Sequence, residues 1–180
     1  MYPYRSSLAQ GNVRNGAEGN INCPIAQNMC RMRYDMNLET EAQAYADTCP
    51  AGASEVSTRP ESGENTEIFS DSTLTNMKVV VQAQELWWKQ IFSQSWDFSI
   101  PYNQYQESAP LAPLRFIQMA WATSYRVGCG IKRCDYGIIF VCRYRPRGNV
   151  YQQYVYTVGA RSTLCSACRS TCSEGLCPAP

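Results

Sequence analysis

The sequence predicts an α+β fold in which helices cover both faces of a single β-sheet. Apolar residues recur at helical spacing in several segments of the chain before residue 125. After residue 126 the chain changes character, with two short segments dense in Ile, Val and Phe joined by a tight turn. The resulting order α, α, β, α, α, β, β, β is typical of a sheet with a helical layer on each face.

The first two helices are defined by the residues that end them. Residues 1–12 read as a helix that stops near Gly11, and residues 13–30 read as a loop. Asn37 is the expected N-cap of the second helix. Pro50 ends that helix, because proline lacks the backbone N–H that a helix interior requires.

A short strand at 66–69 leads into the strongest helical pattern of the chain. Asp71 and Ser72 are the expected caps of a helix over residues 73–92. Its mostly apolar stripe favours packing against the core. The stripe consists of Met77, Val80, Val81, Gln84, Trp87, Trp88 and Ile91.

Residues 93–112 show no clear period but are rich in aromatic rings, which argues against disorder. A segment of this length without secondary structure inside a compact domain is usually either functional or disordered. Pro113 then opens a fourth helix over 114–124. The residues expected to face inward are Phe116, Ile117, Ala120 and Trp121.

The last part of the chain is expected to form strands and then a cysteine-rich tail. Residues 127–133 and 137–144 are predicted strands, and 151–158 is a third candidate. Beyond them, four cysteines occur without any core-forming pattern. We therefore expect one main domain over 1–158, followed by a hinge-like tail over 159–180.

Composition excludes several classes of chemistry. The 180 residues include 16 basic and 15 acidic side chains and no histidine. A net charge of +1 gives no reason to expect nucleic acid or an anionic membrane as the main partner. Without imidazole there is no Ser-His-Asp triad, no Cys-His pair and no histidine metal ligand.

The ten cysteines indicate an extracellular protein. No apolar run is long enough to span a bilayer, and no charged segment followed by an apolar run, typical of a signal peptide, is present. We interpret the chain as the mature form of a secreted protein whose leader has been removed, with the oligomeric state left open.

The tail spaces four cysteines as C-x2-C-x3-C-x4-C, and this spacing allows two interpretations. Four thiolates can bind zinc as a tetrahedron, but the second half lacks the C-x2-C knuckle. Disulfides are the favoured interpretation, with three possible connectivities. The cysteines are Cys165, Cys168, Cys172 and Cys177.

Basic residues alternate near the end of one predicted strand, at Arg143, Arg145 and Arg147, with Lys132 and Arg133 nearby in sequence. Alternate residues of a strand share a face, so these side chains can form one basic surface. Such a surface can meet a sulfated or acidic partner, although a solvated outer face is the more common reason for the pattern.

Four segments together resemble one family. They are 31–49 (RMRYDMNLETEAQAYADTC), 62–69 (SGENTEIF), 113–130 (PLRFIQMAWATSYRVGCG) and 140–149 (FVCRYRPRGN). In this order they are similar to the CAP superfamily of cysteine-rich secretory, antigen 5 and pathogenesis-related proteins. The cysteine-rich tail and the opening Arg-Ser-Ser-Leu-Ala resemble its nematode branch, the activation-associated secreted or venom-allergen-like proteins.

This resemblance implies a three-layer α-β-α sandwich with a central antiparallel sheet and a short C-terminal disulfide-rich hinge. It also implies a disulfide between Cys129 and Cys142, which occupy the family's Gly-Cys-Gly and Val-Cys-x-Tyr motifs. Met36 stands where the family often has a cysteine after Tyr-Asp, so one usual bridge is expected to be rearranged or lost.

The resemblance also implies a metal site that this chain has lost. Members of the family typically carry two histidines and two glutamates around a central cavity that can hold a divalent cation such as zinc. The corresponding residues here are Ala53, Glu64, Gln90 and Arg115, so three of the four are substituted. We expect no bound metal and no cofactor, because Arg115 repels a cation, and we expect Arg115 to form a salt bridge with Glu64.

Relatives bind sterols through a flexible aromatic loop before the fourth helix. The matching residues here are Trp96, Phe98, Pro101, Tyr102 and Tyr105, whose rings can cover the face of a sterol. The expected function is therefore a secreted, non-enzymatic protein that binds a sterol or another lipid and modulates a host.

Two alternatives remain from the sequence. The first is a protein-interaction module that binds a host receptor or plasma component without lipid. The second, and the least favoured, is a metal-dependent hydrolase, because the chain lacks histidine.

Overall fold

The computed structural model describes residues 2–168 and 171–180. Its elements are α1 (Tyr2–Ala9), β1 (Ile25–Ala26), β2 (Arg33–Tyr34), α2 (Met36–Asp47), a 3₁₀ turn (Val56–Thr58), β3 (Gly63–Phe69), α3 (Asn76–Ser93), α4 (Gln104–Glu107), α5 (Leu114–Ala120), β4 (Arg126–Cys134), β5 (Gly137–Arg145), β6 (Val158–Gly159) and a second 3₁₀ turn (Arg161–Thr163). The α+β class and the sandwich that the resemblance implies are confirmed.

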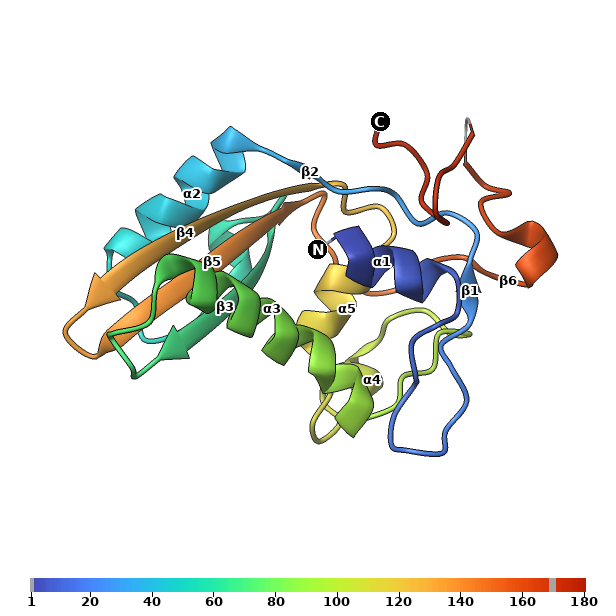
Figure 1. Ribbon diagram of the computed structural model, residues 1–180, viewed down its shortest axis with the longest axis horizontal. Coiled ribbons are helices and arrows are strands. Elements are labelled where there is room, and N and C mark those ends of the chain that lie inside the picture. Colours follow the sequence, from blue (N-terminus) through green and yellow to red (C-terminus); the bar gives the residue numbers. More distant parts are fainter. Residues whose placement is uncertain (1, 169–170) are drawn as a thin grey trace.

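Three layers make up the fold, with α2 on one side of the main sheet and α3 on the other (Figure 1). The sheet has the order β2-β4-β5-β3 and is antiparallel except for the short β2–β4 pair. β1 and β6 form a separate two-stranded sheet. β4 and β5 are the inner strands, and the residues of β5 are buried from Gly137 to Tyr144.

The layer formed by α2 lies very close to β4, and two glycines make this possible. A Cβ atom at Gly128 would lie 2.1 Å from the backbone nitrogen of Glu39, and one at Gly130 would lie 2.5 Å from Gln43. Any larger residue at these positions would push the helix away from the strand. The Gly-Cys-Gly motif is therefore a packing motif for α2.

The second helix is capped two residues earlier than the sequence predicts. The side chain of Asp35, not Asn37, accepts hydrogen bonds from the backbone N–H groups of Asn37 and Leu38. Both residues are good cap formers, and the choice depends on the backbone. Asp35 has an extended backbone and is held by a bond from its N–H to Val127 of β4.

The prediction for the third helix was wrong at its start. The helix begins at Asn76 with Thr75 as its cap, while Asp71 closes a turn with Thr73. The apolar stripe is also shifted at this end, because Met77 is 73% exposed. The buried residues are Val79, Ala83, Trp87, Trp88 and Ile91.

The helix predicted over 114–124 is α5, and it ends at Ala120, earlier than predicted. The buried guanidinium of Arg5 accounts for this end. Arg5 is fully buried and donates to the carbonyl oxygens of Met119, Trp121 and Ala122 and to that of Cys30. These bonds use carbonyl groups that would otherwise continue the helix or remain unsatisfied. α1 is thereby attached to the end of α5.

The third candidate strand, 151–158, does not form; only its last residue lies in β6. Its backbone groups pair elsewhere: Tyr102 exchanges bonds with Gln152 and Gln153, and Ala122 donates to Val155. The segment therefore braces the aromatic loop and does not extend the sheet.

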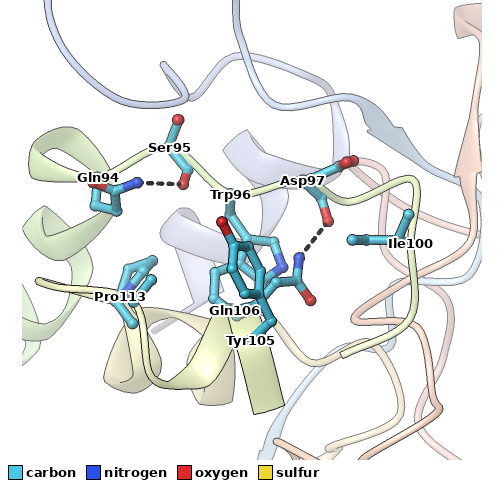
Figure 2. Close-up of a pocket in the computed structure, with 10 residues that line it drawn as sticks. Gln94, Ser95, Trp96, Asp97, Ile100, Tyr105, Gln106 and Pro113 are labelled. Atoms are coloured by element: carbon cyan, nitrogen blue, oxygen red, sulfur yellow. Dashed lines mark hydrogen bonds between the residues drawn. The ribbon is translucent and has the colours of Figure 1, made fainter. Parts of the chain in front are cut away.

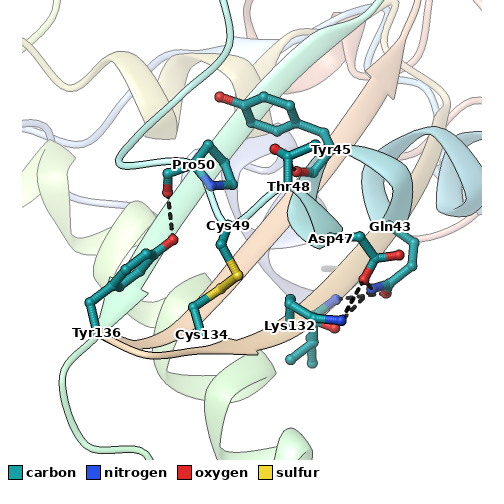
Figure 3. The surroundings of a disulfide bond; sticks show 10 residues. Gln43, Tyr45, Asp47, Thr48, Cys49, Pro50, Lys132, Cys134 and Tyr136 are labelled. Carbon is teal, nitrogen blue, oxygen red and sulfur yellow. Dashed lines mark hydrogen bonds and ion pairs between the residues drawn. A yellow bond between two sulfur atoms is a disulfide. The ribbon is translucent and has the colours of Figure 1, made fainter.

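Four disulfides are present in the described part of the chain. Cys129 is bonded to Cys142, the pair that the resemblance implies, and Cys49 is bonded to Cys134 (Figure 3). The tail contains Cys165–Cys172 and Cys168–Cys177. Cys23 and Cys30 are free thiols.

The Cys49–Cys134 bond ties the end of α2 to the end of β4. Around it, Tyr136 donates to the carbonyl of Pro50 and Lys132 pairs with Asp47 at 3.4 Å (Figure 3). The tail is attached in turn to residues 27–31 by backbone hydrogen bonds. The N–H of Cys177 donates to the carbonyl of Met29, and the carbonyl of Cys177 accepts from the N–H of Arg31. The division at residue 158 remains a prediction.

Candidate functional site

Glu64, the one position of the tetrad implied by the resemblance that keeps a glutamate, is a buried carboxylate surrounded by protein donors. Its side chain is 0% exposed and lies 3.0 Å from the guanidinium of Arg143 and 4.0 Å from that of Arg59. The backbone N–H and hydroxyl of Ser54 and the hydroxyl of Thr66 also donate to it. Ala53, the first of the four tetrad positions along the chain, is exposed and directly precedes Ser54.

The expected salt bridge between Arg115 and Glu64 was wrong. Arg115 pairs with Glu67 at 3.3 Å. Successive residues of a strand point to opposite faces, so Glu64 and Glu67, three residues apart, lie on different sides of β3. Glu64 lies on the α2 side, whereas Glu67 lies on the side that carries α3 and α5.

Gln90 and Arg115 do lie together, on the side of Glu67. The side-chain oxygen of Gln90 accepts from the backbone N–H groups of Arg115 and Phe116, at 3.0 and 3.3 Å. Gln90 therefore caps α5, whose own N-cap, Pro113, offers no side-chain hydrogen bond. The indole of Trp87 donates to Glu67 and completes the cluster.

The four tetrad positions thus fall into two groups on opposite faces of β3, and they do not fit a divalent cation. Ala53 offers no donor atom, and the carboxylate of Glu64 already has the positive charges of Arg143 and Arg59 beside it. The oxygen of Gln90 is used in capping α5, next to the positive charge of Arg115. A cation needs several free oxygen, nitrogen or sulfur ligands directed at one point.

The tail also has a cluster with the dimensions of a metal site. The sulfur atoms of Cys165, Cys168 and Cys172 lie within 4.8 Å of one another. All three are engaged in disulfides, however, and a metal is bound by thiolates. The four cysteines of the tail therefore form disulfides, as the favoured interpretation predicted.

The alternating arginines do not lie on a solvated outer face, although that is the more common reason for such a pattern. Their face of the sheet is covered by α2, so Arg143 is only 6% exposed and lies over the ring of Tyr45. Arg145 pairs with Glu41 of α2 at 3.0 Å.

The predicted lipid-binding residues lie at different depths. Trp96, Phe98 and Tyr102 are at most 4% exposed and pack in the core, whereas Tyr105 is 86% exposed. Tyr102 stacks between Trp96 and Tyr151, with ring centroids 5.7 and 5.6 Å away. Pro101 is half-buried.

A pocket of about 320 Å3 lies beside this segment (Figure 2). Trp96 forms part of its wall, Tyr105 stands at its surface, and Gln106 donates to the backbone of Asp97 across it (Figure 2). The lining residues are Gln94, Ser95, Trp96, Asp97, Ile100, Tyr105, Gln106, Ala109, Ala112 and Pro113. Trp96 and Tyr105 were predicted from the sequence, whereas the other wall residues, which follow α3, belong to α4 or precede α5, were not.

Glu107, which the sequence did not single out, attaches α4 to this region. The hydroxyl of Tyr102 donates to it at 2.9 Å, and the hydroxyl of Tyr151 donates to its other oxygen. Burial, followed by this hydrogen bond, raises the pKa of Tyr102 above its usual value. The pocket wall is therefore fastened by two tyrosines that are far apart in the sequence.

Comparison with known proteins places these features in a family. A sequence model of the CAP: Cysteine-rich secretory protein family matches residues 4–144. The Ancylostoma secreted protein of Ancylostoma caninum is 34% identical over 98% of this chain, and cysteine-rich secretory protein 3 of Equus caballus is 31% identical over 86%. The chain spans 42% and 61% of the lengths of these two relatives.

Solved structures agree with this comparison. The structure of NaASP2 with Zn2+ has a TM-score of 0.87 at 28% identity, covering 97% of this chain and 88% of that one. The structure of Na-ASP-1 has a TM-score of 0.88 at 32% identity and covers 98% of this chain and 44% of that one. In the described residues, no helix combines the length and the apolar character needed to cross a bilayer.

Proposed function

Because the chain belongs to the CAP family of cysteine-rich secretory proteins, we propose that it is a secreted, extracellular protein that acts by binding and not by catalysis. Its relatives carry the words secreted and secretory in their names. Its four disulfides are of the kind that persist in oxidising compartments. We propose that it acts in a host, whose response it modulates.

The ligand proposed is a sterol or another lipid, bound at the pocket beside Trp96. The pocket is the observation that supports this proposal, because it has an indole wall with Ile100 and Tyr105 at the surface. Its volume of about 320 Å3 is at the lower end of the range of roughly 300–1,000 Å3 for small-molecule sites. A sterol would leave part of its ring system outside, against the exposed ring of Tyr105.

Titration with radiolabelled cholesterol tests this proposal. The variant Tyr105→Ala should weaken saturable binding, because it removes an exposed ring without disturbing the core. Trp96→Ala and Phe98→Ala are poor probes, since each would leave a cavity that costs about 3–5 kcal/mol. Tyr154→Ala is the matched control, being half-exposed and outside the pocket. Absence of saturable binding to the wild-type protein would remove the lipid proposal.

The alternative is a protein-interaction module that binds a host receptor or plasma component without lipid. Exposed apolar side chains favour it: Ile100, Tyr105 and Leu111 are 39%, 86% and 76% exposed. Leu111 adopts a positive φ of 60°, which is rare for a leucine and costs roughly 1–2 kcal/mol. The variant Leu111→Gly should relieve this strain and remove the side chain; loss of partner binding with lipid binding unchanged would favour the interaction module.

Catalysis of hydrolysis is the least favoured function, because the chain has no histidine and its tetrad positions do not fit a metal. Proteolysis stimulated by zinc and abolished by a chelator would reverse this order.

A further inference from the structure

Two neighbouring hollows near the end of β5 each have three arginines in their lining. The first, of about 390 Å3, includes Arg59, Arg143 and Arg145, and the second, of about 470 Å3, includes Arg126, Arg145 and Arg147. Arg145 and Glu61 belong to both. We call these joined hollows the arginine groove. It shares no lining residue with the pocket beside Trp96.

The positive charges of the groove are only partly neutralised. Arg143 pairs with Glu64, Arg145 with Glu41 and Arg126 with Asp35. Arg147 has no ion pair in the described part of the chain, and its side chain is half-buried. Arg147 is therefore the guanidinium of the groove that is available to a ligand.

The guanidiniums that line the groove are also short of hydrogen-bond acceptors. The Nε–H groups of Arg126, Arg143 and Arg145 are buried without a partner. The side chain of Arg143 is only 8% exposed, so water cannot readily reach it. A buried donor without an acceptor is costly, and the cost is larger for a charged group. Negative charge in the groove would offset this cost.

The arginines also repel one another. The pKa of Arg59 is lowered chiefly by its burial; Glu64 acts in the opposite direction, and the smaller effects of the neighbouring charges of Arg143 and Arg147 lower it further. Packing like charges together is unfavourable unless an anion lies between them. The two hollows have space for such an anion on each side of Arg145.

Glu61 lines both hollows, is exposed and has no ion pair in the described residues. It lines the same hollows as these arginines, so its negative charge repels any anion bound there. Glu61 thus provides a variant in which binding should improve.

We propose that the arginine groove binds a polyanion that carries sulfate or phosphate ester groups, with Arg147 as the main contact. Tetrahedral oxyanions accept several N–H donors at once and match the planar fork of arginine. Two joined hollows accept two such groups on one molecule, with Arg145 between them. The site is independent of the proposed lipid function.

Calorimetric titration with two probes tests the proposal and distinguishes the two ester classes. Sucrose octasulfate carries sulfate esters, and inositol hexakisphosphate carries phosphate esters. We expect Arg147→Gln to weaken the preferred probe about tenfold, because a charge-assisted contact is lost. Glu61→Gln should strengthen it several-fold. Lys78→Gln, at the start of α3, is the matched control with the same change of charge and should leave the affinity unchanged.

Arg147→Lys keeps the charge but removes the fork, and its affinity should lie between those of the wild type and Arg147→Gln. This variant also serves if Arg147→Gln unfolds, which a thermal melt will show. Failure of both probes to bind would overturn the proposal. The proposal would also be overturned if Arg147→Gln, Arg147→Lys and Glu61→Gln left the affinity for the probe unchanged. The same holds if Lys78→Gln weakened the affinity as much as Arg147→Gln.

Discussion

Arg143 and Glu64 are direct partners across β5 and β3, with a nitrogen of the guanidinium 3.0 Å from a carboxylate oxygen. Both side chains are buried, at 8% and 0% exposure. The family's retained glutamate is thus neutralised by an arginine of the same sheet. The charge of this buried carboxylate is thus balanced within the protein by Arg143, with Arg59 at 4.0 Å.

Arg143→Met should destabilise the protein by about 2–4 kcal/mol, because removal of one partner leaves a buried carboxylate short of its counter-charge. Arg59, 4.0 Å away, limits the loss. Urea unfolding at neutral pH measures the change. Arg161→Met, at an exposed position after β6, is the control and should cost less than about 1 kcal/mol. Equal stability of Arg143→Met and the wild type would contradict the role assigned to this pair.

Zinc should not stabilise the protein. A ligand that binds only the folded state raises the melting temperature, and the tetrad positions offer no such site. Thermal unfolding with excess zinc and with a chelator should therefore coincide. A saturable rise with zinc that disappears in Glu64→Gln would show that the carboxylate still binds a cation.

Gln90→Leu should cost about 1 kcal/mol, because the start of α5 loses the acceptor for two of its N–H groups. Chemical unfolding measures this loss. Gln82→Leu lies on the exposed side of the same helix and should change the stability by no more than about 0.5 kcal/mol. If both variants behave alike, the Gln90 cap contributes nothing.

Arg5→Lys should cost about 3 kcal/mol despite keeping the charge. Arg5 makes five hydrogen bonds to four carbonyl groups, and an ammonium cannot reach all four from one point. Burial lowers the pKa of Arg5 only to about 10, so the group stays charged at neutral pH. Exchange of the backbone amides near residues 119–122 should accelerate in the variant; unchanged exchange would show that α5 ends without this support.

The buried thiol of Cys23 should make the protein less stable in alkali. Burial raises the pKa of Cys23 to about 12, from about 9 in an exposed thiol. Between these values the unfolded chain loses a proton that the folded chain keeps, so stability falls as the pH rises through this range. The stability advantage of the wild type over Cys23→Ala should therefore shrink between pH 8 and pH 11 in urea unfolding. A constant difference would show that the thiol does not titrate differently in the two states.

The sequence predicted the elements well where one local pattern determined them. The strands β4 and β5 and the inward residues of α5 follow from apolar periodicity and a turn, and each is confirmed. The start of α3 and the segment 151–158 were wrong, because caps and strand pairing depend on partners far away in the sequence. Propensity cannot identify those partners.

By itself, the sequence determined which chemistry is absent and which family the chain belongs to. No histidine is available, and the resemblance assigns Ala53, Gln90 and Arg115 to three of the four tetrad positions. The tertiary structure alone decided which charges meet: Glu64 faces Arg143 and Arg59, while Arg115 meets Glu67. The physical reason is the alternation of side chains along β3, which sends residues three apart to opposite layers of the sandwich. Motif spacing gives the order of residues along the chain, but the layers determine their neighbours.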